Sequence, residues 1–458
     1  MPVKKFIDKK LFTLGEGENR LSLFALTFPL FFESISGHLI GMVQTIMATR
    51  YHGGMFVIPI SVASSVVSLF GMVLAIITAG LSILLSIEIG RKHQENCKKI
   101  VGVSLWMSVI LAVILSIVQC VLAKPLLVFM GMDKPDYAPY LSYAITYLRI
   151  RVFAMIIQIV GNVLITSLRC YGHTAQGFVC SLCLNIVSAA GTAIIVYVLK
   201  VPQEHGAMAL GLVPMIAALV YVLIAFAFFI HKKIGACLHW SGEWLKKIFS
   251  IGAPASVSSI SYNISQTVAA MICLSLTPSA YLAKNYLSQV VYFVYIFGYA
   301  IGQANAIIIG RLCGMNELEQ ADKMHRQNLR IVLLCNALLS LITIALGKKL
   351  LVWFYAADEE VAAYATVIFI IDLFVEIGRG MNHLGQFGLN AAGDVRFTTI
   401  VSILSCWGCS IGLSALFVIV FGWDLYGMWI AFAIDELFRG ILYLVRWKKQ
   451  SWRKHLMK

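Results

Sequence analysis

The chain has 458 residues, of which 60% are hydrophobic and only 13% charged, and it carries a formal net charge of +14. With a mean hydropathy of +0.84, this composition excludes an ordinary soluble domain and indicates a multi-pass membrane protein. The positive charge does not indicate a nucleic-acid-binding protein, because the lysines and arginines form short clusters between apolar runs. Basic loops on the cytoplasmic side of a membrane account for that pattern.

The first twenty residues are polar and basic, so we do not expect a cleavable signal peptide there. After them, apolar runs long enough to cross a hydrocarbon core of ~30 Å recur along the whole chain. These runs predict an all-α membrane protein with twelve transmembrane helices, approximately at 22–48, 56–88, 100–122, 141–169, 177–199, 207–230, 248–275, 281–309, 329–347, 362–389, 397–421 and 426–446.

Lysine and arginine are distributed unequally between the two sets of loops. The loops on the side of both termini contain 25 of these residues, against seven on the other side. Cytoplasmic loops carry this excess in membrane proteins, so we expect a cell-membrane protein with both termini in the cytoplasm.

Landmark residues recur at a nearly constant offset, which indicates an internal repeat. Because each half has an even number of helices, both halves enter the membrane from the same side, and the repeat is parallel. The fold class is therefore two six-helix bundles related by a parallel internal repeat. The recurring pairs are Pro29 and Pro254, Gln44-Thr45 and Gln266-Thr267, Gly90-Arg91 and Gly310-Arg311, and Gly172 and Gly393.

The repeat also predicts the domain organisation. The expected parts are a cytoplasmic N-terminal tail at 1–20, an N-terminal lobe at 21–230, a cytoplasmic linker at 231–247, a C-terminal lobe at 248–446 and a basic cytoplasmic tail at 447–458.

Three carboxylates fall near the middle of predicted helices: Glu33, Asp372 and Asp435. A charge at that depth costs between ~2.5 and more than ~10 kcal/mol, so such residues pair with one another, face a wet cavity or move ions. Asp372 shares one helical face with Glu376 and Arg379, because the spacings are four and three residues. A carboxylate exposed alternately to either side can exchange H⁺ or Na⁺ for a cationic substrate.

Structural interpretations remain open for each of these acids. Glu33 follows Pro29 by four residues and can satisfy backbone groups freed by a proline kink. Glu376 with Arg379, and Asp435 with Arg439 four residues later, can form static internal ion pairs. In that case Asp372 is the freer carboxylate.

These features resemble the multidrug and toxic compound extrusion (MATE) family of transporters, in its bacterial form. The resemblance rests on the early prolines, the Gly-Arg pairs, the turn LNAAGDVR at 389–396 and the run EIGRGMN at 376–382. It covers about 21–447 and implies two bundles that open alternately outward and inward, exporting organic cations or drugs in exchange for Na⁺ or H⁺.

The sequence also departs from the family pattern. Gln44 stands where many members have an aspartate in the first helix, and Ala189 stands where an acid often follows Asn185 by four residues. The seventh helix contains no acid. We therefore assign the coupling ion to Asp372, Glu376, Asp435 and Glu33, with Asp372 also a candidate Na⁺ ligand.

The substrate-binding residues are expected to be Gln44, Asn185, Tyr262, Gln266 and Arg379. An enzyme is not expected, because no HExxH, GxSxG or phosphate-binding loop is present. The two CxxC pairs, Cys180/Cys183 and Cys406/Cys409, lie in apolar runs without histidine or acidic neighbours, so we expect neither a dedicated metal site nor a cofactor.

The expected partners are a small organic cation and the lipid bilayer, with no nucleic acid, and the expected state is a monomer. The alternative function is a flippase of lipid-linked sugars or other lipids in the wider superfamily. That cargo favours a cationic cavity, whereas this sequence places at least as many acids as bases at mid-depth.

Overall fold

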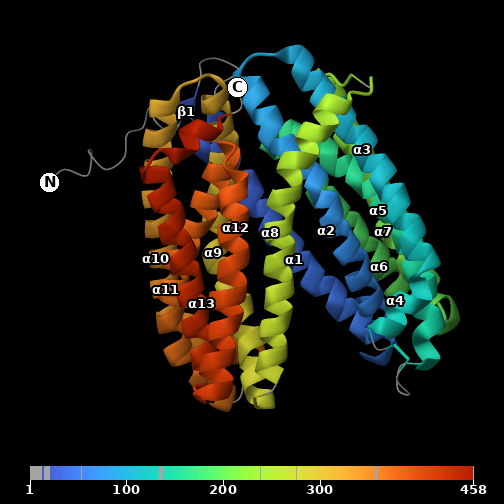
Figure 1. Cartoon of the computed structure of the whole chain (residues 1–458). Helices are drawn as coiled ribbons and strands as arrows, with labels where there is room; N and C mark the ends of the chain where they lie inside the picture. Colours follow the sequence, from blue (N-terminus) through green and yellow to red (C-terminus); the bar gives the residue numbers. More distant parts are fainter. Residues whose placement is uncertain are drawn as a thin grey trace. The chain divides into compact units, whose positions relative to one another are not determined.

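The computed structural model describes residues 13–14, 21–52, 54–130, 132–133, 138–237, 239–274, 276–355 and 359–456. The expected tail at 1–20 lies outside these residues, apart from Thr13–Leu14 (β1), which pairs antiparallel with Leu21–Ser22 (β2). The described remainder is almost entirely helical (Figure 1), so the all-α prediction is confirmed.

The first half contains seven α-helices and two short helical segments. Their bounds are α1 (Leu23–His52), α2 (Gly54–Gly90), α3 (Gln94–Val121), α4 (Ala123–Phe129), η4 (Ala138–Tyr140), α5 (Leu141–Cys170), α6 (Thr174–Ala193), η5 (Ile194–Leu199) and α7 (Gln203–His231).

The second half contains six α-helices and three short helical segments. Their bounds are α8 (Gly242–Leu274), α9 (Pro278–Gly314), α10 (Leu318–Tyr355), α11 (Glu359–Ala391), α12 (Val395–Ser405), η6 (Cys406–Leu413), η7 (Leu416–Val420), α13 (Asp424–Lys448) and η8 (Ser451–His455).

Each of the twelve predicted apolar runs coincides with a long described helix, but ten of these helices meet the length and apolarity needed to cross a membrane. The two others are α8 and α13. In α8, serines interrupt the apolar run, and α13 carries Asp435, Glu436 and Arg439 within two turns. Charged residues lower the hydropathy of a segment even when the protein buries them. The number of crossings therefore stays a prediction of twelve.

The repeat is visible in the turns after the second, fourth and sixth long helices of each half. Each turn contains one residue of positive φ, and the glycines of the fourth-helix turns have φ of 94° and 92°. In those turns His173 N–H donates to Leu168 O and Asp394 N–H donates to Leu389 O, both at 2.9 Å. This bond pattern caps a helix through a left-handed residue, a conformation that glycine adopts without strain. In the other four of these six turns the residues of positive φ are Lys92, Lys233, Asn316 and Gln450.

A second match between the halves is the π-helical geometry that follows both α6 and α12. In the first half it covers η5, and in the second it covers η6 and η7. Such wide turns are rare in helices and mark irregular packing or a functional position. The two halves thus share a deviation from regular geometry as well as their helix order.

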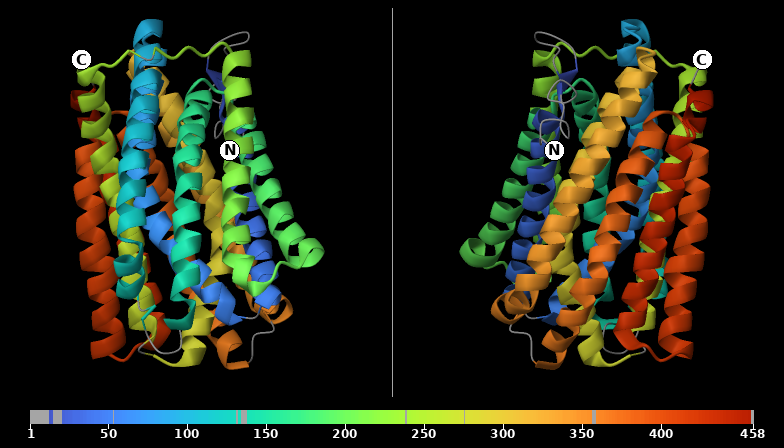
Figure 2. Two further views of the ribbon diagram at one scale, coloured as in Figure 1. Left: turned by 90° about the vertical axis from the view of Figure 1, so that its right-hand side faces the viewer. Right: turned by 90° about the vertical axis from the view of Figure 1, so that its left-hand side faces the viewer.

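The chain divides into two compact units, whose boundaries fall inside α1 and α8. The N-terminal unit is Phe32–Ala253, and the C-terminal unit is Met1–Phe31 with Pro254–Lys458. Within the N-terminal unit, α5 contacts α2, α3, α6 and α7. Figure 2 allows these helices to be followed from two sides by their colours.

Glycines explain why the first turns of α8 belong to the N-terminal unit. A Cβ at Gly252 would lie 1.9 Å from Ile76 O, and a Cβ at Gly80 would lie 2.3 Å from Ile248 O. The backbones of α2 and α8 can approach this closely only because neither glycine has a side chain.

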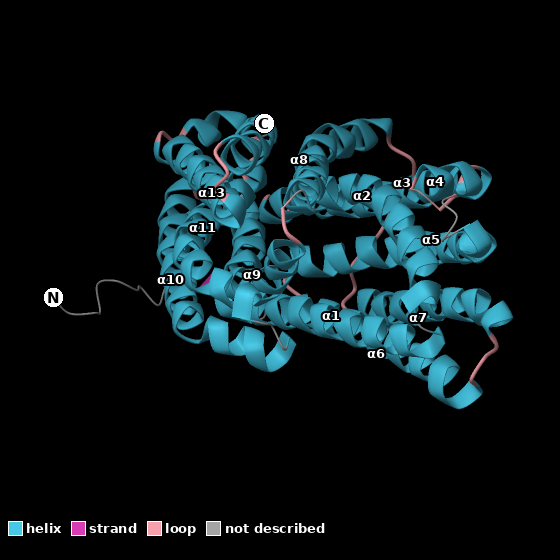
Figure 3. Ribbon diagram, turned by 90° about the horizontal axis from the view of Figure 1, so that it is seen from below, coloured by secondary structure: helices cyan, strands magenta, loops and turns pink. Residues whose placement is uncertain are grey.

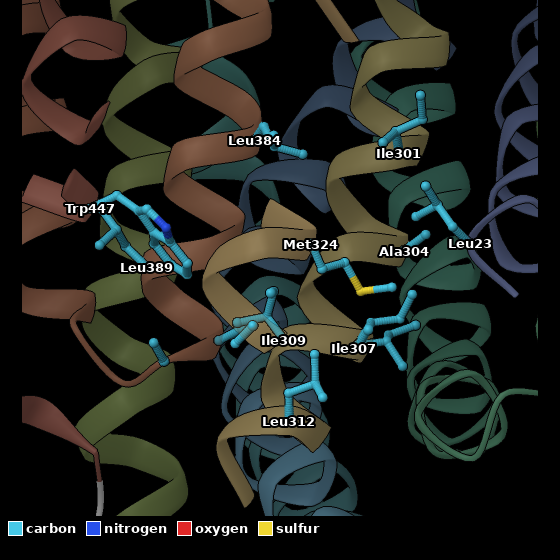
Figure 4. Packing of buried hydrophobic residues seen from close by; sticks show 14 of the residues in the cluster. Leu23, Ile301, Ala304, Ile307, Ile309, Leu312, Met324, Leu384, Leu389 and Trp447 are labelled. Carbon is cyan, nitrogen blue, oxygen red and sulfur yellow. The ribbon is translucent and has the colours of Figure 1, made fainter. Parts of the chain in front are cut away.

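In the C-terminal unit, α11 contacts α9, α10 and α13, and Figure 3 shows these helices side by side in end-on view. Their apolar side chains form a buried cluster that includes Ile301, Met324, Leu384 and Trp447 (Figure 4). Leu23 at the start of α1 belongs to the same cluster, which places the first turns of α1 in this unit. The packing fixes α11 against α13, the two helices that carry the charged site.

Candidate functional site

Six charged side chains meet where α11 packs against α13. Glycines permit the close approach, because a Cβ at Gly378 would lie 2.6 Å from Leu437 N and a Cβ at Gly440 would lie 2.7 Å from Met381 Cβ. The charged residues, here called the charge cluster, are Asp372, Glu376 and Arg379 of α11 and Asp435, Glu436 and Arg439 of α13.

Five members of the charge cluster form a line in which acids and bases alternate. Arg379 pairs with Glu376 on its own helix and lies 3.6 Å through Nε from Glu436 Oε1 of α13. Glu436 Oε1 is also 3.2 Å from Arg439 Nη2, and Arg439 pairs in turn with Asp435. The order is acid, base, acid, base, acid, so both arginines lie between two carboxylates.

Neutral side chains complete the coordination of these carboxylates. Asn382 Nδ2 donates to Glu436 Oε2 at 2.6 Å, and Ser405 Oγ donates to Asp435 Oδ1 at 2.5 Å. Asn336 Nδ2 donates to the backbone oxygen of Glu376 at 3.0 Å and approaches its Oε2 at 3.4 Å. Buried carboxylates are stable only when such donors replace water.

Asp372 lies outside the alternating line. It is 3% exposed, and its Oδ1 accepts a hydrogen bond from Trp429 Nε1 at 3.0 Å. No ion pair to Asp372 is present among the described residues. A neutral indole donor orients this carboxylate but does not balance its charge.

The charge cluster as a whole has more acids than bases. Its four carboxylates and two guanidiniums give a formal surplus of two negative charges when every acid is ionised. Five of the six residues are between 0% and 4% exposed, and Arg379 is 12% exposed at its side chain. Burying an unbalanced charge costs several kcal/mol, so this arrangement favours uptake of protons or cations.

Tyrosines lie against both arginines of the charge cluster. The guanidinium of Arg379 is 4.7 Å from the ring centre of Tyr295 on α9, and that of Arg439 is 5.7 Å from the ring centre of Tyr262 on α8. Gln266 is half-buried one turn after Tyr262. These contacts extend the site from α11 and α13 to α8 and α9.

The N-terminal unit contains a smaller and electrically balanced site. Arg169 Nη2 is 2.5 Å and 2.6 Å from the two carboxylate oxygens of Glu33, and Ser181 Oγ donates to Glu33 Oε1 at 2.5 Å. Arg169 lies one residue before the end of α5, so the pair is close to that end of the helix.

Two predicted substrate residues lie further along α1 and α6. Gln44 Nε2 donates to Ser188 Oγ at 2.7 Å. Asn185 is half-buried, and its Nδ2 would be 3.6 Å from a Cβ at Gly37.

The structure brings some of the predicted site residues together and separates others. Glu376, Asp435, Arg379 and Tyr262 belong to one network, with Asp372 one turn from Glu376. The internal pairs weighed as structural alternatives, Glu376 with Arg379 and Asp435 with Arg439, are both present. Glu33, Gln44 and Asn185 lie in the other compact unit.

Sequence reasoning missed Glu436, which joins the two arginines. Its spacing of three residues from Arg439 was a usable signal, but only the adjacent Asp435 had been singled out. It also missed Trp429 as the donor to Asp372, because an apolar helix offers no sequence signal for a contact with another helix.

The described residues contain no group of three or more His, Cys, Asp or Glu arranged to hold a metal ion.

Comparisons with known proteins agree with the two-repeat architecture. The MatE family model matches residues 29–194 and 254–416, one match in each half. "Uncharacterized transporter YisQ" of Bacillus subtilis is 26% identical over 459 residues, covering 98% of this chain and 99% of the relative. "Probable multidrug resistance protein YoeA" of the same organism is 22% identical over 430 residues, covering 91% of this chain and 90% of the relative.

Solved structures share the fold at low sequence identity. A crystal structure of MATE in the bent conformation superposes with a TM-score of 0.84 at 16% identity, over 94% of this chain and 96% of the other. The outward-facing conformation of a multidrug resistance MATE family transporter of the MOP superfamily gives a TM-score of 0.83 at 16% identity, over 95% and 96%.

Fold, repeat and buried charges together define a multi-pass membrane transporter built from two homologous helical halves. The chain belongs to the MatE family, the multidrug and toxic compound extrusion transporters.

Proposed function

We propose that the protein is a cation-coupled antiporter that exports organic cations or drugs across the cell membrane by alternating access. The observation that carries this proposal is the surplus of two buried negative charges in the charge cluster. A site of this kind binds positive charge from either side and is costly to leave empty, so one cation must be replaced by another before the site can be resealed.

Asp372 is the primary coupling residue in this proposal. Its partner Trp429 fixes the carboxylate without neutralising it, so Asp372 can take up H⁺ or Na⁺ directly. Glu376 and Asp435 are secondary coupling residues, because each is already shared with an arginine. Because Arg379 and Arg439 are each shared between two carboxylates, a change in the charge of one acid alters the electrostatic interactions of the next acid in the line.

The organic substrate competes for the same negative charge. We assign its contacts to Arg379, Tyr262 and Gln266 in the C-terminal unit and to Gln44 and Asn185 in the N-terminal unit. The rings of Tyr295 and Tyr262 already face the guanidiniums of Arg379 and Arg439, so in this proposal an organic cation takes the place of an arginine at a ring. Glu33 is a coupling residue only if its bond to Arg169 opens during the cycle, because that pair is neutral as it stands.

The remaining assignments follow the topology. We propose lobes at 21–230 and 248–446 joined by a cytoplasmic linker at 231–247, with both termini cytoplasmic, and a monomeric transporter that needs no organic cofactor. Several relatives are named as multidrug resistance proteins, such as "Probable multidrug resistance protein NorM" of Xanthomonas axonopodis, and this supports drug export. Surplus negative charge does not suit a phosphate-bearing lipid-linked sugar, so we do not propose a flippase.

The test is efflux of a fluorescent organic cation from inverted membrane vesicles that contain the protein. A Na⁺ gradient and a pH gradient are imposed in separate experiments, each with an ionophore that collapses the gradient as a control. We expect dye movement under at least one gradient and none after its collapse. Vesicles that contain correctly inserted protein but move no cation under either gradient would refute the proposal.

A further inference from the structure

The chain between α7 and α8 is fixed to the start of α3 in the N-terminal unit. Cys237 N–H donates to Lys98 O at 2.9 Å, and a Cβ at Gly102 would lie 1.8 Å from Cys237 O. A Cβ at Gly235 would lie 2.9 Å from Lys98 Cγ. Because the two backbones touch, the connecting segment, the start of α3 and the start of α8 form one continuous surface.

This surface carries more lysine than acid. Its exposed acids, Glu95 and Glu243, pair with lysines of their own helices, Lys98 at 2.8 Å and Lys247 at 2.6 Å. Exposed lysines with no ion pair among the described residues are Lys99, Lys233 and Lys246.

The charge of one lysine of α3 reaches an acid of α8. The hydrogen bond and charge of Lys247, together with the more distant charge of Lys99, hold the pKa of the Glu243 carboxyl below its ordinary value. Because Lys99 is on α3 and Lys247 is on α8, lysines of both helices contribute to the positive potential at Glu243.

Large apolar side chains are exposed beside these lysines. Trp240 is 50% exposed and Phe249 is 49% exposed. Between them, Trp244 is buried and lies under Lys247, whose Nζ is 4.6 Å from the ring centre. Exposed tryptophan next to lysine at the end of a membrane helix is typical of segments in the headgroup region, where the ring meets the lipid and the amine meets phosphate.

We propose that this surface is a binding site for the headgroup of an anionic phospholipid. Lys99, Lys233 and Lys246 contact the phosphate, and Trp240 and Phe249 contact the glycerol and upper acyl chain. A soluble polyanion would engage the lysines but not the apolar side chains, so the mixed surface favours a lipid. The site shares no residue with the charge cluster and does not depend on the transported substrate.

The test is titration of the purified full-length protein with phosphatidylglycerol or phosphatidylcholine in detergent, with bound lipid counted by native mass spectrometry. We expect phosphatidylglycerol to bind more tightly than phosphatidylcholine. In the triple variant Lys99→Gln, Lys233→Gln and Lys246→Gln, its Kd should rise about a hundredfold, from roughly fivefold for each lysine lost.

A matched control removes the same charge elsewhere. The variant Lys124→Gln, Lys348→Gln and Lys349→Gln alters three exposed lysines of α4 and α10, and its Kd should stay within about twofold of the wild type. If the first triple variant does not fold, the three single variants and Trp240→Ala are titrated instead, each expected to weaken binding several-fold. Equal binding of both lipids, or unchanged affinity for phosphatidylglycerol in the first triple variant, would each overturn the proposal.

Discussion

Replacing Asp372 with asparagine separates the charge of this residue from its shape. Asparagine has the same size and can still accept the hydrogen bond that Trp429 Nε1 donates at 3.0 Å. The apolar contacts of α11 are unchanged, so we expect normal folding and membrane insertion. The substitution removes one of the two surplus negative charges that the charge cluster holds when its acids are ionised.

The expected loss can be estimated from the burial of the site. Removing one partner from a buried charge interaction costs ~3–5 kcal/mol, which is equivalent to about two to four orders of magnitude in apparent ion affinity. Because Asp372 is 3% exposed, solvent cannot replace the missing charge. Efflux driven by an ion gradient should therefore fall to the background of empty vesicles.

The assay is fluorescent-cation efflux from inverted vesicles at matched protein content, under a Na⁺ gradient and under a pH gradient. Asp424→Asn is the control, because Asp424 lies at the start of α13, away from the charge cluster, and accepts a hydrogen bond from Tyr364 at 2.6 Å. The control should retain wild-type efflux. Normal efflux from Asp372→Asn under the coupling gradient would show that the surplus charge at Asp372 has no part in transport.

Three further substitutions test neighbouring parts of the structure. Trp429→Phe removes a hydrogen bond that stabilises the ionised Asp372 carboxylate by ~1.5–3 kcal/mol. Because the ion-free carboxylate is then less stable, the coupling ion should bind at least about tenfold more tightly, which lowers the half-saturating ion concentration. An unchanged or higher concentration contradicts this. Glu436→Gln breaks the alternating line and should destabilise the protein by ~3 kcal/mol in thermal unfolding; an unchanged melting temperature contradicts this. Gly102→Ala should lower the free energy of unfolding by ~1–3 kcal/mol, because the new methyl group displaces the connecting segment. Gly242→Ala is the control and should change it little, because a Cβ there would have no neighbour within 4 Å. Equal effects of the two substitutions would refute the close contact.

The helices and the repeat could be predicted from the sequence because both leave local signals. The helices appear as apolar runs, and the repeat appears as residues that recur at matching positions. Every backbone polar group within the hydrocarbon must be satisfied inside its own helix, so apolar length alone marks a span. The recurrence of Gly172 and Gly393 reflects a local requirement as well, since both have strongly positive φ at a helix end. Apolarity alone does not identify α13 as a span. Its charged residues lower the hydropathy of the helix, and part of their compensation comes from Arg379 on another helix, which a local window does not include.

The pairing within the site could be predicted only where both partners lie on one helix. Spacings of three and four residues predict Glu376 with Arg379 and Asp435 with Arg439. The link between Arg379 and Glu436 depends on how α11 packs against α13, which is decided by glycines that permit close approach.

The partner of Glu33 was equally hidden from sequence. Its partner Arg169 is 136 residues away in the chain and lies on another helix. Spacing along one helix contains no information about such a contact.

The two charged sites differ in the net charge on which a membrane potential can act. Glu33 and Arg169 cancel, so a shift of that pair along the bilayer normal moves no net charge. The charge cluster does not cancel, and each unbalanced elementary charge carried through the full field is worth ~2.3 kcal/mol per 100 mV. If ions bind to the charge cluster within the membrane field, we therefore expect the potential to act on its surplus charge and not on the neutral pair of Glu33 and Arg169.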